Sequence, residues 1–290
     1  MWTGTKEQFF ELYKTAATHL KEKFPNIKIG GYGSCGFYSI YEEDADDLNR
    51  TFNTYLYDFL TMIKEENIPF DFFSWHTYSD SLEKFTSYMK FARETLEKYG
   101  FANIEIHCNE WNVGGEGNGY HLMRNMTGAS YIASAMCIMQ NTDYVDKAAY
   151  YVFSSAASYN GFFDLNTRHK TCTYYAFKAF GKCHKLKNQV FVENNSSDLQ
   201  AIAASNGKEC SVLISNYNGE NTEASIKLNN IPENCQVFVD YISESCEPKT
   251  QVYNSNGSDL EITLNIAKNN VVTINILPAS TENYSSYLDY

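Results

Sequence analysis

Apolar helical repeats alternate with short apolar strands over the first 187 residues, and this alternation constrains the fold most. Strands are predicted to start near residues 27, 70, 104 and 148, with about 34 to 44 residues from each start to the next. Amphipathic helices are predicted over residues 5–24, 44–66, 81–99, 124–141 and 171–183. Helical crossovers of this length make consecutive strands parallel, so the sequence predicts an α/β fold.

The composition changes after about residue 187. The remaining residues form short alternating apolar and polar runs, separated by turn signals such as Asn206-Gly207 and Asn218-Gly219. We therefore predict an α/β domain over residues 1–187 and an all-β domain over residues 188–290.

The number of βα units leaves two architectures open. A (β/α)8 barrel needs eight units over roughly 250 residues, whereas four are found here. The α/β part is therefore either a small doubly wound sheet or one half of a barrel. A doubly wound sheet that binds a phosphate or nucleotide is the weaker alternative, because Gly30-Gly31-Tyr32-Gly33 lacks both the GxGxxG and the P-loop spacing.

Composition excludes several classes of function. The net charge of −12 opposes binding to nucleic acid, and no apolar run approaches the roughly 18 residues that a membrane span needs. The eight cysteines form no CxxC pair, so we expect buried free thiols. His169, Cys172 and the Cys183-His184 pair flank a predicted helix and are interpreted as packing residues; we expect neither a metal nor an organic cofactor.

Polar residues stand at the carboxyl end of each predicted parallel strand, where active sites of such sheets form. Singly, each has an ordinary explanation as a loop or packing residue. Together they bring a carboxylate, an imidazole, a phenol and an indole to one rim, which suits a sugar-cleaving site. In chain order the residues are Gly30, Gly31, Gly33, His76, Tyr78, Asn109, Glu110, Trp111, Asn112, Ser154 and Ser155.

Five stretches of the chain resemble one enzyme family: "TKEQFFELYKTAATHLKEKFPNIKIGG", "DFFSWHTYSD", "IEIHCNEWN", "YYVFSS" and "HKTCTYYAFKAF". They are similar to the C-terminal half of glycoside hydrolase family 39, the β-xylosidase and α-L-iduronidase group. This resemblance implies that residues 1–187 are about strands 5 to 8 of a (β/α)8 TIM barrel, a partial catalytic domain. Residues 188–290 would then be a β-sandwich accessory domain.

The resemblance also implies roles for individual residues. Glu110, at the end of the seventh barrel strand, matches the catalytic nucleophile, and Tyr78 matches the tyrosine that hydrogen-bonds it. The fourth strand of the barrel also ends in Asn-Glu in this clan, but only one βα unit follows residue 112, which favours the seventh. The implied sugar-binding residues are His76, Tyr78, Asn109, Trp111 and Tyr151.

The chain departs from the family pattern at several positions. The Asn-Glu motif of the acid/base would lie just before Trp2-Thr3-Gly4, so we expect it in a missing N-terminal segment. Tyr151 stands where the clan has Trp, Ser155 replaces Asp, and Asn109 replaces Thr. Lys170-Thr171 replaces Lys-Pro. We assign the acid/base role to none of the acids expected in loops, which are Glu42, Glu43, Asp80, Glu116 and Asp164.

We therefore expect a retaining glycoside hydrolase of the β-xylosidase type that acts on a xyloside-like carbohydrate and has no cofactor. The alternative is a non-catalytic carbohydrate-binding pseudoenzyme or a gene fragment. A half-barrel exposes two strand edges, so we expect self-association through them. The chain begins without a signal peptide, but a missing N-terminal segment would leave both a cytoplasmic and a secreted location open.

Overall fold

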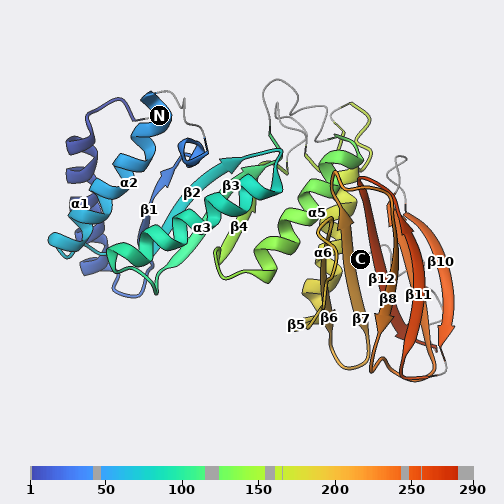
Figure 1. Ribbon diagram of the computed structural model, residues 1–290. Coiled ribbons are helices and arrows are strands. Elements are labelled where there is room, and N and C mark those ends of the chain that lie inside the picture. Colours follow the sequence, from blue (N-terminus) through green and yellow to red (C-terminus); the bar gives the residue numbers. More distant parts are fainter. Residues whose placement is uncertain are drawn as a thin grey trace. The chain divides into compact units, whose positions relative to one another are not determined.

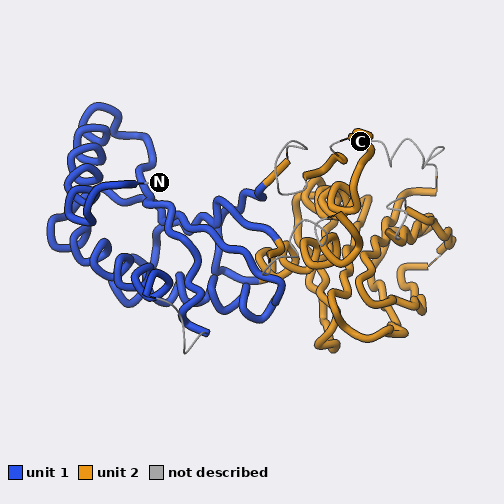
Figure 2. The backbone as a smooth tube through the Cα atoms, turned by 90° about the horizontal axis from the view of Figure 1, so that it is seen from above, with its two compact units in different colours: residues 1–112, 142–151 blue, residues 113–141, 152–290 orange. Residues whose placement is uncertain are grey.

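The protein is described by a computed structural model that covers residues 2–41, 47–114, 124–153, 161–164, 166–242, 248–255 and 257–279. It forms two compact units, which Figure 2 shows in different colours: residues 1–112 with 142–151, and residues 113–141 with 152–290. The second unit takes in helices on the N-terminal side of residue 187 as well as the strands after it. The division into domains at residues 187 and 188 stays a prediction.

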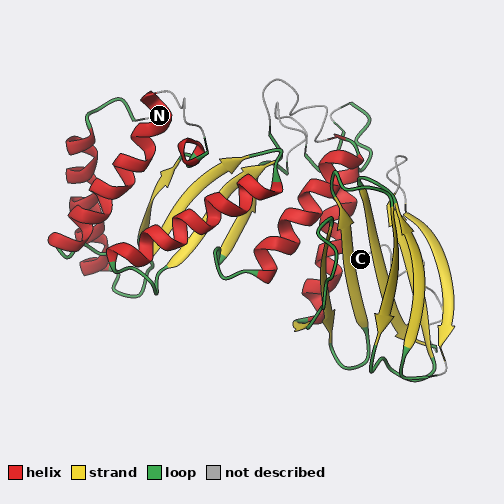
Figure 3. Cartoon of the chain, viewed as in Figure 1, coloured by secondary structure: helices red, strands yellow, loops and turns green. Residues whose placement is uncertain are grey.

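The first unit contains a parallel sheet with the strand order β1-β2-β3-β4. Parallel pairing follows from the helical crossovers, as the strand spacing predicts. In chain order the elements of this unit (Figures 1 and 3) are α1 (Lys6–Lys23), β1 (Gly30–Ser34), the 3-10 helix η1 (Tyr38–Ile40), α2 (Asp47–Glu65), β2 (Phe72–Tyr78), α3 (Leu82–Tyr99), β3 (Glu105–Asn112) and β4 (Lys147–Tyr150).

Aromatic rings of the helices pack against aromatic rings of this sheet. Phe59 of α2 meets Tyr32 of β1 with ring centroids 4.9 Å apart, and Phe85 of α3 meets Trp111 of β3 at 5.9 Å. Along β2, Phe73, Trp75 and Thr77 alternate as fully buried residues, which is the two-residue period of a strand with one covered face. The alternating residues His76 and Tyr78 lie on the other face and are partly exposed.

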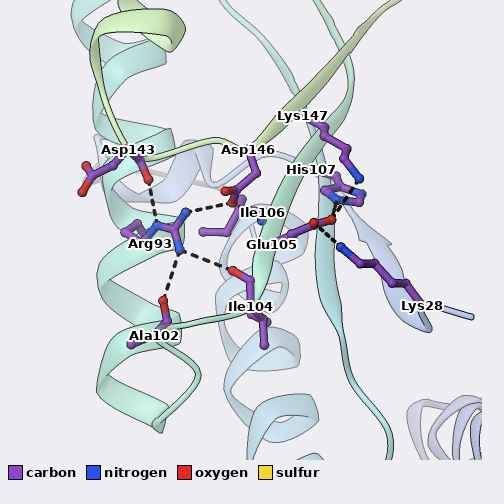
Figure 4. A network of polar contacts seen from close by, with 10 residues as sticks. All are labelled: Lys28, Arg93, Ala102, Ile104, Glu105, Ile106, His107, Asp143, Asp146 and Lys147. Carbon is purple, nitrogen blue, oxygen red and sulfur yellow. Dashed lines mark hydrogen bonds and ion pairs between the residues drawn. The ribbon is translucent and has the colours of Figure 1, made fainter. Parts of the chain in front are cut away.

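A polar network holds the amino ends of the strands, as Figure 4 shows. The carboxylate of Glu105 accepts hydrogen bonds from Lys28 and from Lys147, the latter at 3.0 Å, and lies 2.9 Å from His107 Nε2. Beside it, Arg93 of α3 donates to the Asp146 carboxylate at 3.0 Å. The same Asp146 carboxylate accepts from the Ile106 N–H of β3 at 2.7 Å. The network therefore joins β3 to the segment before β1, to β4 and to α3.

The second unit is layered. Its six-stranded antiparallel sheet has the order β10-β9-β12-β7-β6-β5, and a two-stranded sheet pairs β11 with β8. One apolar cluster joins α5 and α6 to the larger sheet, and another joins the larger sheet to the smaller one. The elements are α5 (Met126–Asn141), α6 (Cys172–Leu186), β5 (Asn188–Val190), β6 (Leu199–Ser205), β7 (Cys210–Asn216), β8 (Thr222–Leu228), β9 (Cys235–Ile242), β10 (Pro248–Ser255), β11 (Leu260–Ile266) and β12 (Asn270–Pro278).

Local signals in the sequence have the expected structures. Thr5 and Gln8 form a capping box at the start of α1. The Asn206 side chain accepts hydrogen bonds from the N–H groups of Lys208 and Glu209, and Gly207 has a φ of +86°, so this pair makes the turn from β6 to β7. None of the helices in the described part of the chain is both long and apolar enough to span a membrane.

The cysteine prediction is partly wrong. Cys108, Cys137, Cys183 and Cys235 are buried free thiols, as expected. Cys172, however, is disulfide-bonded, and Cys35 is an exposed free thiol. Disulfide formation depends on the distance between two cysteines in the fold, which the spacing of cysteines in the sequence did not indicate.

Candidate active site

The carboxyl ends of β2 and β3 bring three of the predicted site residues together. His76 is the register partner of Glu110, and Tyr78 lies two residues further along β2, on the same face as His76. The side chains of His76 and Glu110 are 31% and 33% exposed. All three can therefore face a ligand at this end of the sheet.

One additional residue in β3 produces this alignment. Trp75 pairs with Cys108, but the next residue, His76, pairs with Glu110, so Asn109 has no counterpart in β2. The pairing with β4 skips a residue in the same stretch of β3. Such an irregularity changes the faces to which the following side chains point. It puts Glu110 beside His76 rather than on the covered face with Ile106 and Cys108.

Two groups surround the Glu110 carboxylate. The Tyr78 hydroxyl donates a hydrogen bond to Oε1 at 2.7 Å. His76 Nδ1 lies 3.6 Å from Oε2, within ion-pair distance when the imidazole is protonated. A hydrogen bond from a phenol stabilises the ionised form of a carboxylate and fixes its orientation.

The end of β1 completes this side of the site. Gly33 has a φ of +74° and is an additional residue relative to β2; a Cβ placed on it would lie 4.0 Å from His76 Nε2. Cys35 follows β1, and desolvation by neighbouring groups and the negative charge of Glu110 both raise the pKa of its thiol. The Cys35 thiol therefore lies within the electrostatic range of Glu110.

Two other predicted sugar-binding residues have different environments. Asn109 is exposed next to Glu110. Trp111 is 1% exposed and packs between Phe85 of α3 and Tyr150 of β4, with ring centroids 5.9 and 5.5 Å away. The indole thus lies in the core on the covered face of the sheet, on the side away from Glu110.

Tyr151 follows β4 directly. Its backbone N–H donates to the carbonyl of Trp111 at 3.0 Å, and its carbonyl accepts from the buried Asn112 side chain at 2.6 Å. Its side chain is 38% exposed. These two hydrogen bonds hold the Tyr151 backbone at the end of β3, and part of the Tyr151 ring remains accessible.

Of the acids expected in loops, Asp164 is poorly suited to donate a proton. Asp164 accepts hydrogen bonds from the N–H groups of Thr167 and Asn166 at 2.9 and 3.0 Å, and it pairs with Arg124. These contacts lower the pKa of Asp164, first through the Thr167 backbone, and a carboxyl that is ionised at neutral pH is a poor acid. Asp80 is exposed after β2. Glu42, Glu43, Glu116, Ser154 and Ser155 lie outside the described residues.

The described residues bring no three His, Cys, Asp or Glu side chains together as a metal site requires.

Two residues beside the site, Cys35 and Tyr38, were not predicted. Tyr38 of η1 contacts the strand that carries Tyr78: its hydroxyl oxygen accepts a hydrogen bond from the Tyr78 backbone N–H at 3.1 Å. Tyr38 and Cys35 lie in a segment without periodicity, so no sequence signal marked them.

Comparison with known proteins gives consistent matches. The sequence model of the family "Glycosyl hydrolases family 39" matches residues 1–217. A β-xylosidase of Geobacillus stearothermophilus is 26% identical over 210 residues, which are 61% of this chain and 37% of that protein. A β-xylosidase of Caldicellulosiruptor saccharolyticus is 26% identical over 282 residues, covering 86% of this chain and 53% of that protein. The chain therefore spans about half the length of these relatives or less.

Solved structures share the fold. A glucosidase from Croceicoccus marinus superimposes with a TM-score of 0.78 at 20% identity, covering 96% of this chain and 66% of the other. At this identity the similarity establishes the α/β fold and carries no statement about substrate.

Proposed function

The chain belongs to glycosyl hydrolases family 39, and from this premise we propose that it is a retaining glycoside hydrolase of the β-xylosidase type with Glu110 as nucleophile. One observation carries the proposal: the Tyr78 hydroxyl donates to Glu110 at 2.7 Å at the carboxyl end of a parallel sheet. The names of the two curated relatives support a xyloside as the substrate class.

The arrangement suits the first half of a double displacement. Glu110 attacks the anomeric carbon, the bond to the leaving oxygen breaks, and a glycosyl ester forms on the carboxylate. Tyr78 holds the carboxylate in its orientation until the attack. His76 lies on the other side of Glu110, where it can contact a sugar hydroxyl. Tyr151 and Asn109, both exposed near the strand ends, are the further proposed sugar contacts.

Trp111 has a supporting part in this proposal. Its ring is buried beneath α3. It can therefore hold the backbone of its two neighbours, Glu110 and Asn112, but does not present a surface to a sugar. We retain it in the proposed site in that capacity.

The acid/base is proposed to come from a segment outside these 290 residues. A retaining glycosidase needs a second carboxyl group about 5 to 5.5 Å from the nucleophile. The share of the relatives that this chain spans, 37% and 53%, leaves room for such a segment in a longer protein. Without it, we expect the chain to react only with substrates whose leaving group needs no proton.

The parallel sheet is proposed to be strands 5 to 8 of a (β/α)8 barrel. Its four strands follow one another in sequence order, as barrel strands do. Within the described residues β1 and β4 each pair with one neighbour, and Lys147, Ala148 and Ala149 of β4 are exposed. Four further strands would cover these edges. The two sheets of the second unit, with the apolar cluster between them, are proposed to be the accompanying β-sandwich.

The proposal is tested with 2,4-dinitrophenyl β-xyloside, whose leaving group departs without a general acid. We expect a burst of about one equivalent of dinitrophenolate per chain, and a gain of one pentosyl residue on the peptide that contains Glu110, measured by mass spectrometry. Glu110→Gln should abolish both signals. Glu105→Gln, which changes the same residue type at the other end of β3, should keep them.

The alternative function is non-catalytic binding of a carbohydrate by a pseudoenzyme or gene fragment. It is favoured by the share of the relatives that this chain spans, 37% and 53%, because the described residues supply no assigned second carboxyl group. In that case xylose or xylobiose would bind, with changes in NMR signals near His76 and Tyr78, while no ester forms on Glu110. An ester that survives in Glu110→Gln would contradict the assignment of the nucleophile.

A further inference from the structure

The segment between β1 and α2, here called the β1–α2 strap and comprising residues 35–41, is fixed to three elements. Its Phe37 ring is completely buried and stacks on Trp75 of β2 at 5.5 Å. Ser39 accepts a hydrogen bond from Asn53 of α2 at 3.0 Å. Tyr41 hydrogen-bonds with Ser87 of α3. The strap is therefore a well-anchored part of the fold.

Tyr38 connects this strap to the strand that carries Tyr78. The pairing of β1 with β2 ends at Ser34 and Trp75, so β2 continues past the end of its neighbour. There the backbone N–H of Tyr78 donates to the Tyr38 hydroxyl oxygen at 3.1 Å. A buried N–H group needs such a partner.

The Tyr38 ring is itself held in place. It meets Tyr88 of α3 edge to face, with centroids 5.5 Å apart and planes at 90°. Burial raises the pKa of Tyr38, so the phenol remains neutral, and its oxygen accepts from the Tyr78 N–H. Two consecutive hydrogen bonds then lead from the strap to the carboxylate: Tyr78 N–H to Tyr38, and Tyr78 hydroxyl to Glu110.

We propose that Tyr38 is a positioning residue for the reaction at Glu110: it fixes the backbone of Tyr78 and thereby aims the Tyr78 hydroxyl at the carboxylate. This inference rests on the proposed function. Tyr78 is the last residue of β2, where a strand frays most easily. A displacement of about 1 Å in a group that orients a reacting atom can reduce a rate up to about a hundredfold.

The test compares Tyr38→Phe with Tyr41→Phe in the full chain. Tyr38→Phe keeps the ring against Tyr88 and removes only the acceptor oxygen, whereas Tyr41→Phe removes another phenol oxygen from the same strap. Both are treated with 2,4-dinitrophenyl β-xyloside, and the rate of ester formation is measured against substrate concentration. We expect Tyr38→Phe to lower the maximal rate about tenfold or more at an unchanged half-saturating concentration. Tyr41→Phe should behave as the wild type.

A second readout does not depend on activity. In protein labelled with ¹³C at the glutamate carboxyl, the Glu110 signal is identified by its loss in Glu110→Gln. We expect this signal to shift in Tyr38→Phe and to stay in place in Tyr41→Phe, because the hydrogen bond from Tyr78 changes only in the first. A Glu110 signal at the wild-type position in Tyr38→Phe overturns the inference.

The two readouts separate the inference from the proposed function. If the wild type forms no ester, the proposed function fails, and the carboxyl signal alone decides the role of Tyr38. If the wild type forms the ester and Tyr38→Phe forms it at the same maximal rate, the proposed function stands and the role of Tyr38 is refuted.

Discussion

Glu110 and His76 share a face of the sheet because β3 has an additional residue relative to β2, and β1 on the other side of β2 has one too. Asn109 is the additional residue of β3, and Gly33 that of β1. Gly33 has a left-handed φ of +74° next to the His76 ring, a conformation that costs a residue with a Cβ roughly 1 to 2 kcal/mol. The geometry of the site thus depends on two local irregularities of the backbone.

Gly33→Ala should destabilise the protein through this backbone strain. A Cβ at Gly33 has room, since its nearest neighbour is His76 Nε2 at 4.0 Å, so the expected loss of unfolding free energy is the conformational cost alone, about 1 to 2 kcal/mol. Gly181→Ala in α6 is the matched control: a Cβ there meets nothing within 4 Å, and helix propensity should make it stabilising by up to about 1 kcal/mol. Calorimetric transitions that move in the same direction for both variants would contradict this explanation.

The sequence led to Glu110 through its place at the end of an apolar strand, and the family resemblance led to Tyr78 as its hydrogen-bond partner. The face of the sheet to which Glu110 points could not be predicted from the pattern of the strand. Strict alternation from Ile106 and Cys108 would have turned Glu110 toward the helices. Trp111 shows the reverse: its position next to Glu110 in the sequence indicated a sugar contact, yet the additional residue turns it into the core. Shifts of register depend on neighbouring strands, which a single strand sequence does not contain.

At the scale of elements, Glu105 joins three parts of the sheet at its amino end. Hydrogen bonds from Lys28, His107 and Lys147, in that order of importance, lower the pKa of Glu105 to about 2 from an ordinary value of 4.5. Because the pKa in the folded state is lower than in the unfolded state, the ionised group stabilises the fold above about pH 4.5. This contribution is lost as the pH falls from 4.5 toward 2.

Acid unfolding of the first unit should therefore depend on Glu105. Trp2, Trp75 and Trp111 all belong to this unit, so tryptophan fluorescence follows its unfolding. We expect the urea midpoint to fall between about pH 4.5 and 2, and less steeply in Glu105→Gln. Glu261→Gln, in β11 of the second unit, should leave the slope unchanged. High salt should weaken the effect because the side chains of Lys28 and Lys147 are 57% and 59% exposed.

Most elements could be predicted because their patterns are strong. The capping box of α1 and the turn at Asn206-Gly207 follow from local chemistry, and the parallel order of the sheet follows from the length of the crossovers. The surroundings of α5 could not be predicted: nearly all of its residues from Met126 to Cys137 are buried, so its sequence has no polar face that would indicate which surface it covers. It packs with α6 on the six-stranded sheet of the second unit.

At the scale of the whole molecule, the surface of the first unit has an apolar stripe. Leu12, Ala16 and Leu20 follow one another at intervals of four residues on the exposed side of α1, and Phe24 continues the row. Leu12, Leu20 and Phe24 are 50%, 40% and 48% exposed. Within the described residues β1 and β4 each pair with a single neighbouring strand, and strand edges with apolar neighbours favour association.

We predict that the chain self-associates when it is produced alone. Sedimentation velocity should show an average mass that rises with protein concentration, because the stripe and the strand edges lose water-exposed apolar surface on contact. Leu12→Glu combined with Leu20→Glu puts two charges into the stripe and should shift the distribution toward the monomer. Leu48→Glu changes a residue of α2 that is 63% exposed and lies outside the stripe, so it should leave the distribution unchanged. A monomer of constant mass over the full concentration range would refute the prediction and would count against an open half-barrel.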